Sequence, residues 1–238
     1  MYRLIRDYWD GPLPDPDLRT MDDMRVVLAN PECPTPDRPL YYMYRNLART
    51  DEDRAWLDAQ DLRYDITVIP PGALCGEFVK TKGHYHPQNP AGVEYPELYQ
   101  VLSGQAHFLF QHRQLTDMVV CTAREGQAVL VPPGYGHVTI NPGREVVVMA
   151  NLVSSRFASD YEFFEGMQGA AYYECTGGVW RKNPRYAVMP GLRFTEPPQI
   201  PELCLAHGSS IYLLLSREGC LDYLNHPERH LEQLTGFI

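Results

Sequence analysis

The sequence contains no long hydrophobic run, since none approaches the ~18 consecutive apolar residues that a membrane-spanning helix needs. It also lacks an excess of basic residues: its 238 residues include 21 Lys and Arg against 30 Asp and Glu, a formal net charge of −9. This balance excludes the basic face of a non-specific nucleic-acid binder. Residues 1–10 contain arginine and aromatic side chains but no apolar stretch with a cleavage site, which predicts no secretory signal and a cytoplasmic protein.

Cysteine is present, but never as a C-x-x-C pair. The six cysteines lie far apart in the sequence: Cys33, Cys75, Cys121, Cys175, Cys204 and Cys220. In a chain without a secretory signal, this pattern predicts free thiols in a reducing compartment. No neighbouring residue indicates that any of them is a nucleophile.

The local character of the sequence changes along the chain, although there is no internal repeat. Residues 1–38 are rich in Pro, Asp and Arg and predict one short helix at 21–28. A strand is predicted at 40–47, and a helix with acidic residues at its N-terminal end at 51–60. From 64 to 152, short β-rich runs alternate with Gly and Pro turns, which is typical of a sandwich or barrel.

The remainder of the sequence is less regular. Residues 157–186 are rich in aromatics and glycine and are predicted to be extended structure that covers the barrel. Residues 187–202 are interrupted by proline and predict a loop, and an apolar run follows at 211–215. A helix is predicted from Pro227, because proline suits the first helical position.

Two of the eight histidines, His84 and His86, are two residues apart. On a strand, such residues point to the same face, ~7 Å apart, so both imidazoles can reach one ion. Glu97 and His137 complete a set of three imidazoles and one carboxylate, which suits a divalent transition metal and leaves positions open for a substrate. Taken alone, the His84–His86 pair would more often be a chance surface pattern. The other histidines have no such spacing and predict surface or packing roles: His107, His112, His207, His226 and His230.

The pair is not alone, because its neighbours resemble two signature motifs of the cupin superfamily. The first motif is carried by His84, His86, Glu97 and Gly104, and the second by Gly126, Pro132, Gly134, His137 and Asn141. The first has a longer interval than usual between its second histidine and the glutamate. The resemblance implies an all-β cupin double-stranded β-helix (jelly-roll) barrel at 39–186. Extensions with short helices are expected at 1–38 and 187–238.

A narrower resemblance rests on Thr81-Lys82-Gly83-His84-Tyr85-His86, on Pro96-Glu97-Leu98-Tyr99 and on the turn after Val131. These segments are similar to the cupin-type phosphoglucose isomerase family of archaea and some bacteria. The resemblance implies a metal-dependent aldose–ketose isomerase that interconverts glucose 6-phosphate and fructose 6-phosphate in glycolysis and gluconeogenesis. It also implies a homodimer with one divalent metal ion per subunit, Fe²⁺ or Mn²⁺ first, with Zn²⁺, Ni²⁺ or Co²⁺ as alternatives.

Position by position, the resemblance implies three groups of site residues. His84, His86, Glu97 and His137 would be the metal ligands, with Glu97 and Tyr99 nearest the migrating hydrogen. Tyr41, Thr67, Thr81 and Gly83 would hold the substrate phosphate. Lys82 would be an added positive charge, but strand alternation predicts that it turns away from Thr81 and Gly83.

Several questions stay open in the sequence. A proton transfer through a carboxylate and a metal-assisted hydride shift are both compatible with these residues. Family members often carry a tyrosine and a histidine where this chain has Val153 and Ser159, so the acid or base for ring opening is not identified. Use of mannose 6-phosphate and the role of residues 187–238 are equally open.

Two other functions share the same fold and ligands. A cupin dioxygenase would use the metal to bind oxygen and would have an apolar pocket without phosphate donors. A non-catalytic cupin that binds a sugar phosphate would keep those donors and would tolerate loss of Glu97. The presence of all four ligands favours catalysis.

Overall fold

The computed structural model describes residues 5–206 and 208–236. Its largest sheet contains, in spatial order, β1 (Asp17–Thr20), β2 (Pro39–Tyr44), β3 (Leu62–Ile69), β11 (Val147–Ser154), β6 (Glu97–Ser103) and β9 (Ala128–Val131). A second sheet contains β10 (Tyr135–Ile140), β7 (Gln105–His112), β8 (Met118–Arg124) and β14 (Arg193–Thr195). A third contains β13 (Val179–Lys182), β12 (Tyr172–Cys175), β5 (Glu77–Phe78) and β4 (Ala73–Leu74).

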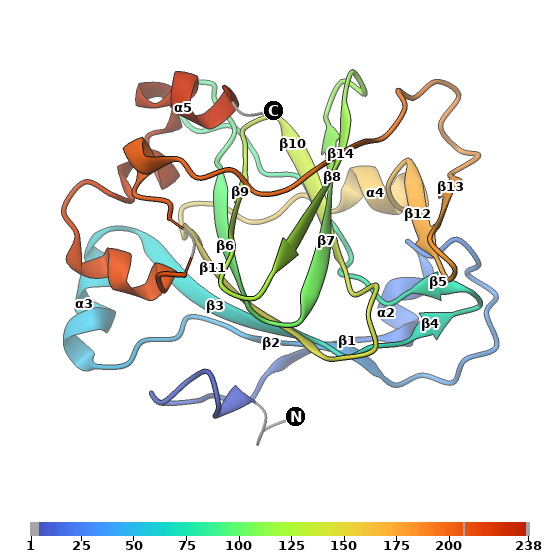
Figure 1. Cartoon of the computed structure of the whole chain (residues 1–238), viewed down its shortest axis with the longest axis horizontal. Coiled ribbons are helices and arrows are strands. Elements are labelled where there is room, and N and C mark those ends of the chain that lie inside the picture. The colour runs from blue at the N-terminus through green and yellow to red at the C-terminus, as the bar shows by residue number, and fades with distance from the viewer. Residues whose placement is uncertain (1–4, 207, 237–238) are drawn as a thin grey trace.

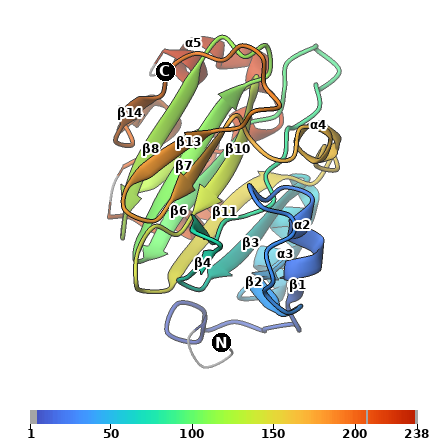
Figure 2. The ribbon, with the colours of Figure 1, turned by 90° about the vertical axis from the view of Figure 1, so that its right-hand side faces the viewer.

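The first two sheets pack face to face as open sheets, which Figures 1 and 2 show from two directions. Their facing side chains form one apolar core that includes Val101 and Met149 from the first sheet and Phe108 and Val138 from the second. The strand pairs are antiparallel except β14 with β8. The prediction of an all-β cupin jelly-roll is therefore confirmed, and β1, from the expected N-terminal extension, belongs to its main sheet.

The helices are short, and α2 and α3 begin where the sequence provides capping side chains. They are α2 (Met21–Arg25), α3 (Asp51–Ala59), α4 (Glu162–Gly166) and α5 (Leu231–Thr235), with 3₁₀ turns η1 (Pro201–Leu203), η2 (Ile211–Ser216), η3 (Asp222–Leu224) and η4 (Pro227–Arg229). Thr50 accepts a hydrogen bond from the Asp53 backbone N–H at the start of α3, and Thr20 and Asp23 form a capping box at α2. None of the helices in the described ranges is long and apolar enough to cross a membrane.

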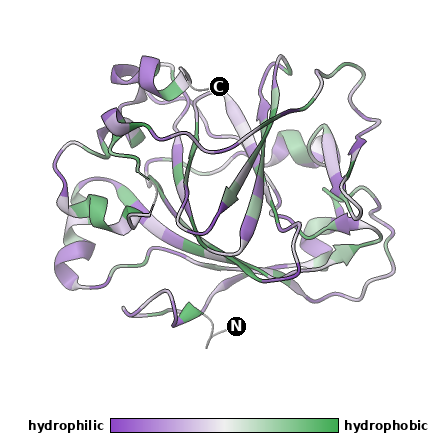
Figure 3. Cartoon of the chain, viewed as in Figure 1, coloured by the Kyte–Doolittle hydropathy of each residue, from purple (hydrophilic) through white to green (hydrophobic). Residues whose placement is uncertain are grey.

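The C-terminal segment covers the outer face of the six-stranded sheet. Ile211, Leu214 and Leu224 pack with outward-facing residues of β3, β11 and β6 in a second apolar core. Figure 3 shows η2 as strongly hydrophobic, whereas the neighbouring α3 is largely hydrophilic. The predicted apolar run at 211–215 is thus a buried 3₁₀ turn, and the helix expected from Pro227 is η4 followed by α5.

Two local predictions are corrected by the structure. Residues 157–186 are not extended throughout, because α4 begins at Glu162 and a β12–β13 hairpin follows. The strand expected at 40–47 ends at Tyr44, since Asn46 adopts a positive φ of 54°.

The prediction of six free thiols is also wrong. Disulfides join Cys33 to Cys75 and Cys204 to Cys220, and Cys121 and Cys175 are free. The two partners of each bridge are separated by 42 and 16 residues, so only the folded chain brings them together.

Candidate metal centre

Three histidines meet between the two main sheets. His84 and His86 lie in the segment between β5 and β6, and their Nε2 atoms are 3.1 Å apart. His137 lies in β10, where its backbone pairs with that of His84 through reciprocal hydrogen bonds of 3.3 and 3.1 Å. The structure therefore brings all three imidazoles to one point.

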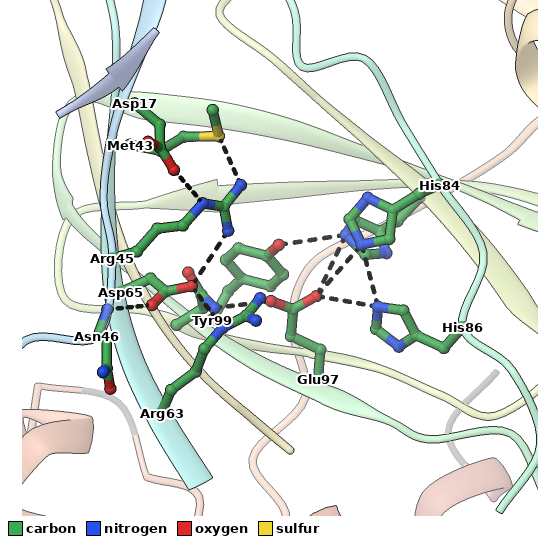
Figure 4. Close-up of polar contacts among 12 residues, drawn as sticks. Asp17, Met43, Arg45, Asn46, Arg63, Asp65, His84, His86, Glu97 and Tyr99 are labelled. Atoms are coloured by element: carbon green, nitrogen blue, oxygen red, sulfur yellow. Dashed lines mark hydrogen bonds and ion pairs between the residues drawn. The ribbon is translucent and has the colours of Figure 1, made fainter. Parts of the chain in front are cut away.

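Glu97 begins β6 and points its carboxylate at this point from the six-stranded sheet (Figure 4). Its Oε2 atom lies 3.4 Å from Nε2 of both His86 and His137, and 4.0 Å from Nε2 of His84. The four potential ligand atoms all lie within 4.8 Å of one another. This is the four-residue set named from the sequence.

Two neighbouring groups orient these ligands. The Nδ1 of His86 lies 2.7 Å from the Tyr95 carbonyl oxygen, which can only accept, so Nδ1 carries the proton and Nε2 presents its lone pair to the cluster. Asn151 donates a hydrogen bond of 2.8 Å to Oε1 of Glu97, which leaves Oε2 directed at the histidines. Both contacts are of the kind that fix ligands around a metal ion.

The surroundings favour the neutral form of His84 and His137. Burial, together with the nearby His137 and His86, lowers the pKa of His84 well below its usual value. Burial is also the main cause that lowers the pKa of His137 to about 4. Neutral imidazoles are the form that binds a metal ion.

The residues fit a divalent ion. Oε2 of Glu97 is buried and accepts no hydrogen bond of good geometry from any described residue, although buried carboxylate oxygens normally have partners. Three imidazole nitrogens and one carboxylate oxygen form a donor set that suits Fe²⁺, Mn²⁺, Co²⁺, Ni²⁺ or Zn²⁺. A cation at this point would satisfy the unpaired oxygen.

The four clustered residues line a pocket. Every residue assigned to the phosphate lines the same pocket. The pocket is lined by Tyr41, Met43, Arg45, Arg63, Asp65, Thr67, Thr81, Lys82, Gly83, Tyr99, Met149, Asn151, Val153, Ser159 and Tyr161 beside the four ligands. Tyr41 accepts a hydrogen bond from the Lys82 backbone N–H (3.1 Å), and Thr81 accepts one from the Thr139 backbone N–H (2.9 Å). Each hydroxyl therefore keeps its own proton available to donate.

Gly83 is required by the backbone at this position. Its φ is +78°, and a Cβ atom there would lie 2.6 Å from the Val138 side chain. This turn interrupts the strand alternation, so the expectation that Lys82 turns away is wrong. Lys82 lines the same pocket as Thr81 and Gly83, and its Nζ lies 2.7 Å from Oε1 of Glu165.

Tyr99 and Tyr161 stand above the cluster. The Tyr99 hydroxyl lies 3.2 Å from Nε2 of His137, and the ring centre of Tyr161 lies 5.3 Å from that of His84. Burial, and then the charge of Glu97, raise the pKa of Tyr99 well above its ordinary value. Tyr99 therefore keeps its proton at neutral pH.

Sequence reasoning missed a polar group on the same wall of the pocket. Arg45, Arg63 and Asp65 line the pocket beside the four clustered residues, and Figure 4 shows Arg45 and Asp65 on the far side of Tyr99 from His86. A signal was available, because residues two apart on a strand share a face and Thr67 was assigned to the pocket. The same alternation places Asp65 and Arg63 inward on β3.

The histidines set aside in the sequence lie outside this pocket. His107 contacts Glu174, His112 contacts Thr116, His226 contacts Glu228 and His230 contacts Asp222. His207 lies outside the described residues.

Comparison with known proteins agrees with the geometry. The "Glucose-6-phosphate isomerase (GPI)" family model matches residues 18–190. Glucose-6-phosphate isomerase of Thermococcus gammatolerans is 34% identical over 130 residues, which cover 54% of this chain and 66% of that protein. The Pyrococcus furiosus enzyme of the same name is 33% identical over 101 residues, covering 42% of this chain and 51% of that one. This chain thus spans less than two thirds of the length of these curated relatives.

A solved structure with a similar arrangement is the formate complex of Lactobacillus farciminis oxalate decarboxylase. It aligns with a TM-score of 0.39 and 17% identity, over 51% of this chain and 30% of that one. The family match itself extends over most of the chain, from β1 to beyond β13, and includes all four clustered ligands. This chain belongs to the glucose-6-phosphate isomerase (GPI) family.

Proposed function

We propose that this chain is a metal-dependent aldose–ketose isomerase that interconverts glucose 6-phosphate and fructose 6-phosphate. The observation that carries the proposal is one pocket with two chemically distinct ends. His84, His86, Glu97 and His137 converge at one end. The second set, here called the phosphate wall, comprises Tyr41, Thr67, Thr81 and Gly83; it begins directly beside His84 and extends along the sheet to Thr67 and Tyr41. A hexose 6-phosphate has a matching pair of ends, a carbonyl and a phosphate.

The metal end would act on the carbonyl. When bound, a divalent ion held by the four ligands would polarise the sugar carbonyl and offset negative charge on its oxygens. Asn151 and the Tyr95 carbonyl hold Glu97 and His86 in the orientation that this requires. The donor set accepts several divalent ions, and the resemblance to cupin-type phosphoglucose isomerases implies Fe²⁺ or Mn²⁺ first.

The candidate acid and base groups at this end are Tyr99 and Glu97. Tyr99 remains protonated, so its hydroxyl can donate to a substrate oxygen but cannot act as a base. Glu97 has one oxygen engaged by Asn151 and the other directed at the histidines, which favours a role as ligand and makes it a weak base. Proton transfer and hydride shift both remain compatible with this arrangement.

The other end would bind the phosphate. The hydroxyls of Tyr41 and Thr81 each have a proton to donate, and burial raises the pKa of Tyr41 to about 12, so it stays protonated. Lys82 lines the same pocket, where its charge is paired with Glu165. Hydrogen bonds to an anion are stronger than those to a neutral acceptor.

The decisive experiment is to incubate the pure protein with fructose 6-phosphate and a panel of divalent metals, and to measure glucose 6-phosphate formation. We expect no activity after chelation and recovery with Mn²⁺ or Fe²⁺. Full activity in protein shown to be metal-free by elemental analysis would falsify the metal-dependent mechanism. Oxygen consumption without isomerisation would indicate a cupin dioxygenase, and binding without turnover a sugar-phosphate-binding cupin.

The role in glycolysis and gluconeogenesis, the homodimer and the cytoplasmic location stay predictions. So does the division into an N-terminal extension, a catalytic domain and a C-terminal extension. Each follows from the sequence and the resemblance. Sedimentation of the purified protein would test the dimer directly.

A further inference from the structure

The strand register defines rows of side chains across the floor of the pocket. Arg63 on β3 is opposite Val153 on β11, which is opposite Glu97 on β6. Directly opposed residues of antiparallel strands point to the same face of a sheet. Arg63 therefore lies level with the metal-ligating carboxylate, and a small apolar side chain separates the two.

The next row explains how Arg63 is held. Asp65 is 3% exposed, and its carboxylate accepts hydrogen bonds from the Asn46 backbone N–H (2.8 Å), from Nε of Arg63 (2.9 Å) and from Arg45 (3.5 Å). Arg45 is occupied further by Asp17 and by the Met43 sulfur (Figure 4). Asp65 and Arg45 thus have their hydrogen-bonding groups directed at other protein atoms.

Arg63 differs from Arg45 in this respect. Within the described ranges, no residue accepts a hydrogen bond from either terminal nitrogen of Arg63, although the side chain is only 29% exposed. Its neighbour Val153 offers no acceptor. The planar end of the guanidinium consequently presents free donors to the pocket at the level of Glu97.

We propose that Arg63 binds the oxygens at the carbonyl end of the sugar substrate, and that Asp65 is a positioning residue that fixes the Arg63 guanidinium. The proposal rests on the isomerase function proposed above. A guanidinium is always charged and offers two parallel donors, which suit adjacent sugar oxygens that gain negative charge during isomerisation.

Arg63 lies in a different row of the sheet from Thr67, the residue of the phosphate wall on the same strand. Thr67 is four residues further along β3, so the two Cα atoms are ~13 Å apart on the same face. Asp65 stands between them. Arg63 and Thr67 would hold opposite ends of one substrate.

The test compares Arg63→Gln and Arg63→Lys with the wild type on fructose 6-phosphate. Arg193→Gln is the matched control, since Arg193 forms a comparable pair with Asp117 at 2.9 and 2.7 Å outside the pocket. Asp65 keeps Arg45 as a partner in both Arg63 variants, so its buried charge stays compensated. Thermal unfolding reports whether each variant is folded, and elemental analysis reports its metal content. If Arg63→Gln does not fold, the kinetics of Arg63→Lys decide the test.

We expect Arg63→Gln to lower kcat/KM by about 10- to 100-fold, mainly through kcat, with a smaller loss in Arg63→Lys and none in the control. Inhibition by inorganic phosphate, which probes the other end of the pocket, should be unchanged. Asp65→Asn should lower kcat less than Arg63→Gln and add nothing to it in the double variant. If the losses of kcat from the two single variants add in the double variant, Asp65 acts independently of Arg63 and is not its positioning residue.

Three results would overturn the proposal. Wild-type kinetics in Arg63→Gln would remove Arg63 from the site while the isomerase function stands. Weaker inhibition by inorganic phosphate in the Arg63 variants would assign Arg63 to the phosphate instead. An inactive wild-type enzyme with each metal would remove the proposed function, and this proposal with it.

Discussion

The two faces of the six-stranded sheet are both buried, yet they are built from different side chains. On β3, Arg63, Asp65 and Thr67 face the pocket, while Tyr64, Ile66 and Val68 alternate with them and face outward. The outward residues are at most 3% exposed, because the C-terminal segment covers them. One face is thus organised for chemistry and the other for stability.

Three aromatic rings hold the C-terminal segment, here called the cover, against the outer face of the sheet. The rings of Trp9, Tyr64 and Tyr212 contact one another with centroids 4.9 to 5.5 Å apart, which joins the N-terminal segment, the sheet and η2. The family match ends at residue 190, before this cover begins. The comparison teaches that activity and stability should be separable by substitutions on opposite faces of the same strands.

The largest effect is expected on the inner face, at Glu97. Glu97→Gln preserves size but removes the negative ligand, so we expect activity to fall by at least ~100-fold with little change in stability. The measurement is glucose 6-phosphate formation together with thermal unfolding. Glu174→Gln is the control, because Glu174 also pairs with a histidine but lies outside the pocket. Normal turnover with normal metal content in Glu97→Gln would deny Glu97 an essential role.

A substitution on the outer face should lower the stability of the protein and leave its activity almost unchanged. Leu152 is fully buried beneath the C-terminal segment, and its neighbour Val153 lines the pocket. We expect Leu152→Ala to lose about 2–5 kcal/mol of the free energy of unfolding, because it leaves a cavity. Urea denaturation measures that loss, while kcat/KM of the folded protein should stay within about twofold. A large loss of kcat/KM without destabilisation would contradict the separation of the two faces.

The cover itself is tied by the Cys204–Cys220 disulfide. Its partners are 16 residues apart, a loop for which cross-linking contributes about 3 kcal/mol by restricting the unfolded chain. Cys204→Ser should therefore lower the free energy of unfolding by about that amount and leave metal binding intact. Denaturation with and without reductant is the measurement. Equal stability in both conditions would mean that the bridge contributes nothing to the cover.

The smallest effect is expected at the phosphate wall. Tyr41→Phe and Thr81→Val should each lower kcat/KM on fructose 6-phosphate by about 10- to 100-fold, the value of one charge-assisted hydrogen bond. Tyr42→Phe is the matched control, since Tyr42 is the next residue of β2 and packs on the outer core. Activity on free fructose should barely change. Equal losses on both sugars would mean that these residues support the fold and do not read the phosphate.

Much of the fold and of the metal cluster could be predicted because the signals are local. The i, i+2 spacing of His84 and His86 already determines that both imidazoles share a face. The Gly and Pro turns between short β-rich runs determine the class of the fold, which the structure confirms. Cupin motifs then added Glu97 and His137, which are distant in sequence.

Other features depend on long-range contacts that no local pattern carries. The Cys33–Cys75 bridge requires an N-terminal loop to lie against β4, and the wide spacing of the cysteines favoured free thiols instead. Lys82 enters the pocket because Gly83 breaks the alternation that the sequence suggested. The position of Arg63 in the row of Glu97 follows from the pairing of β3 with β11, and this pairing is known only once the sheet is assembled.

Strand β11 pairs with β3 on one side and β6 on the other, with Met149, Asn151 and Val153 inward and Val148, Ala150 and Leu152 outward. Because the side-chain period of a strand is two, inserting or deleting one residue here would exchange the faces. Leucine would enter the pocket, and the asparagine that orients Glu97 would be driven into the apolar cover. The fold therefore tolerates substitution within β11 more readily than a change in its length, and insertions or deletions fit only in the turns at either end.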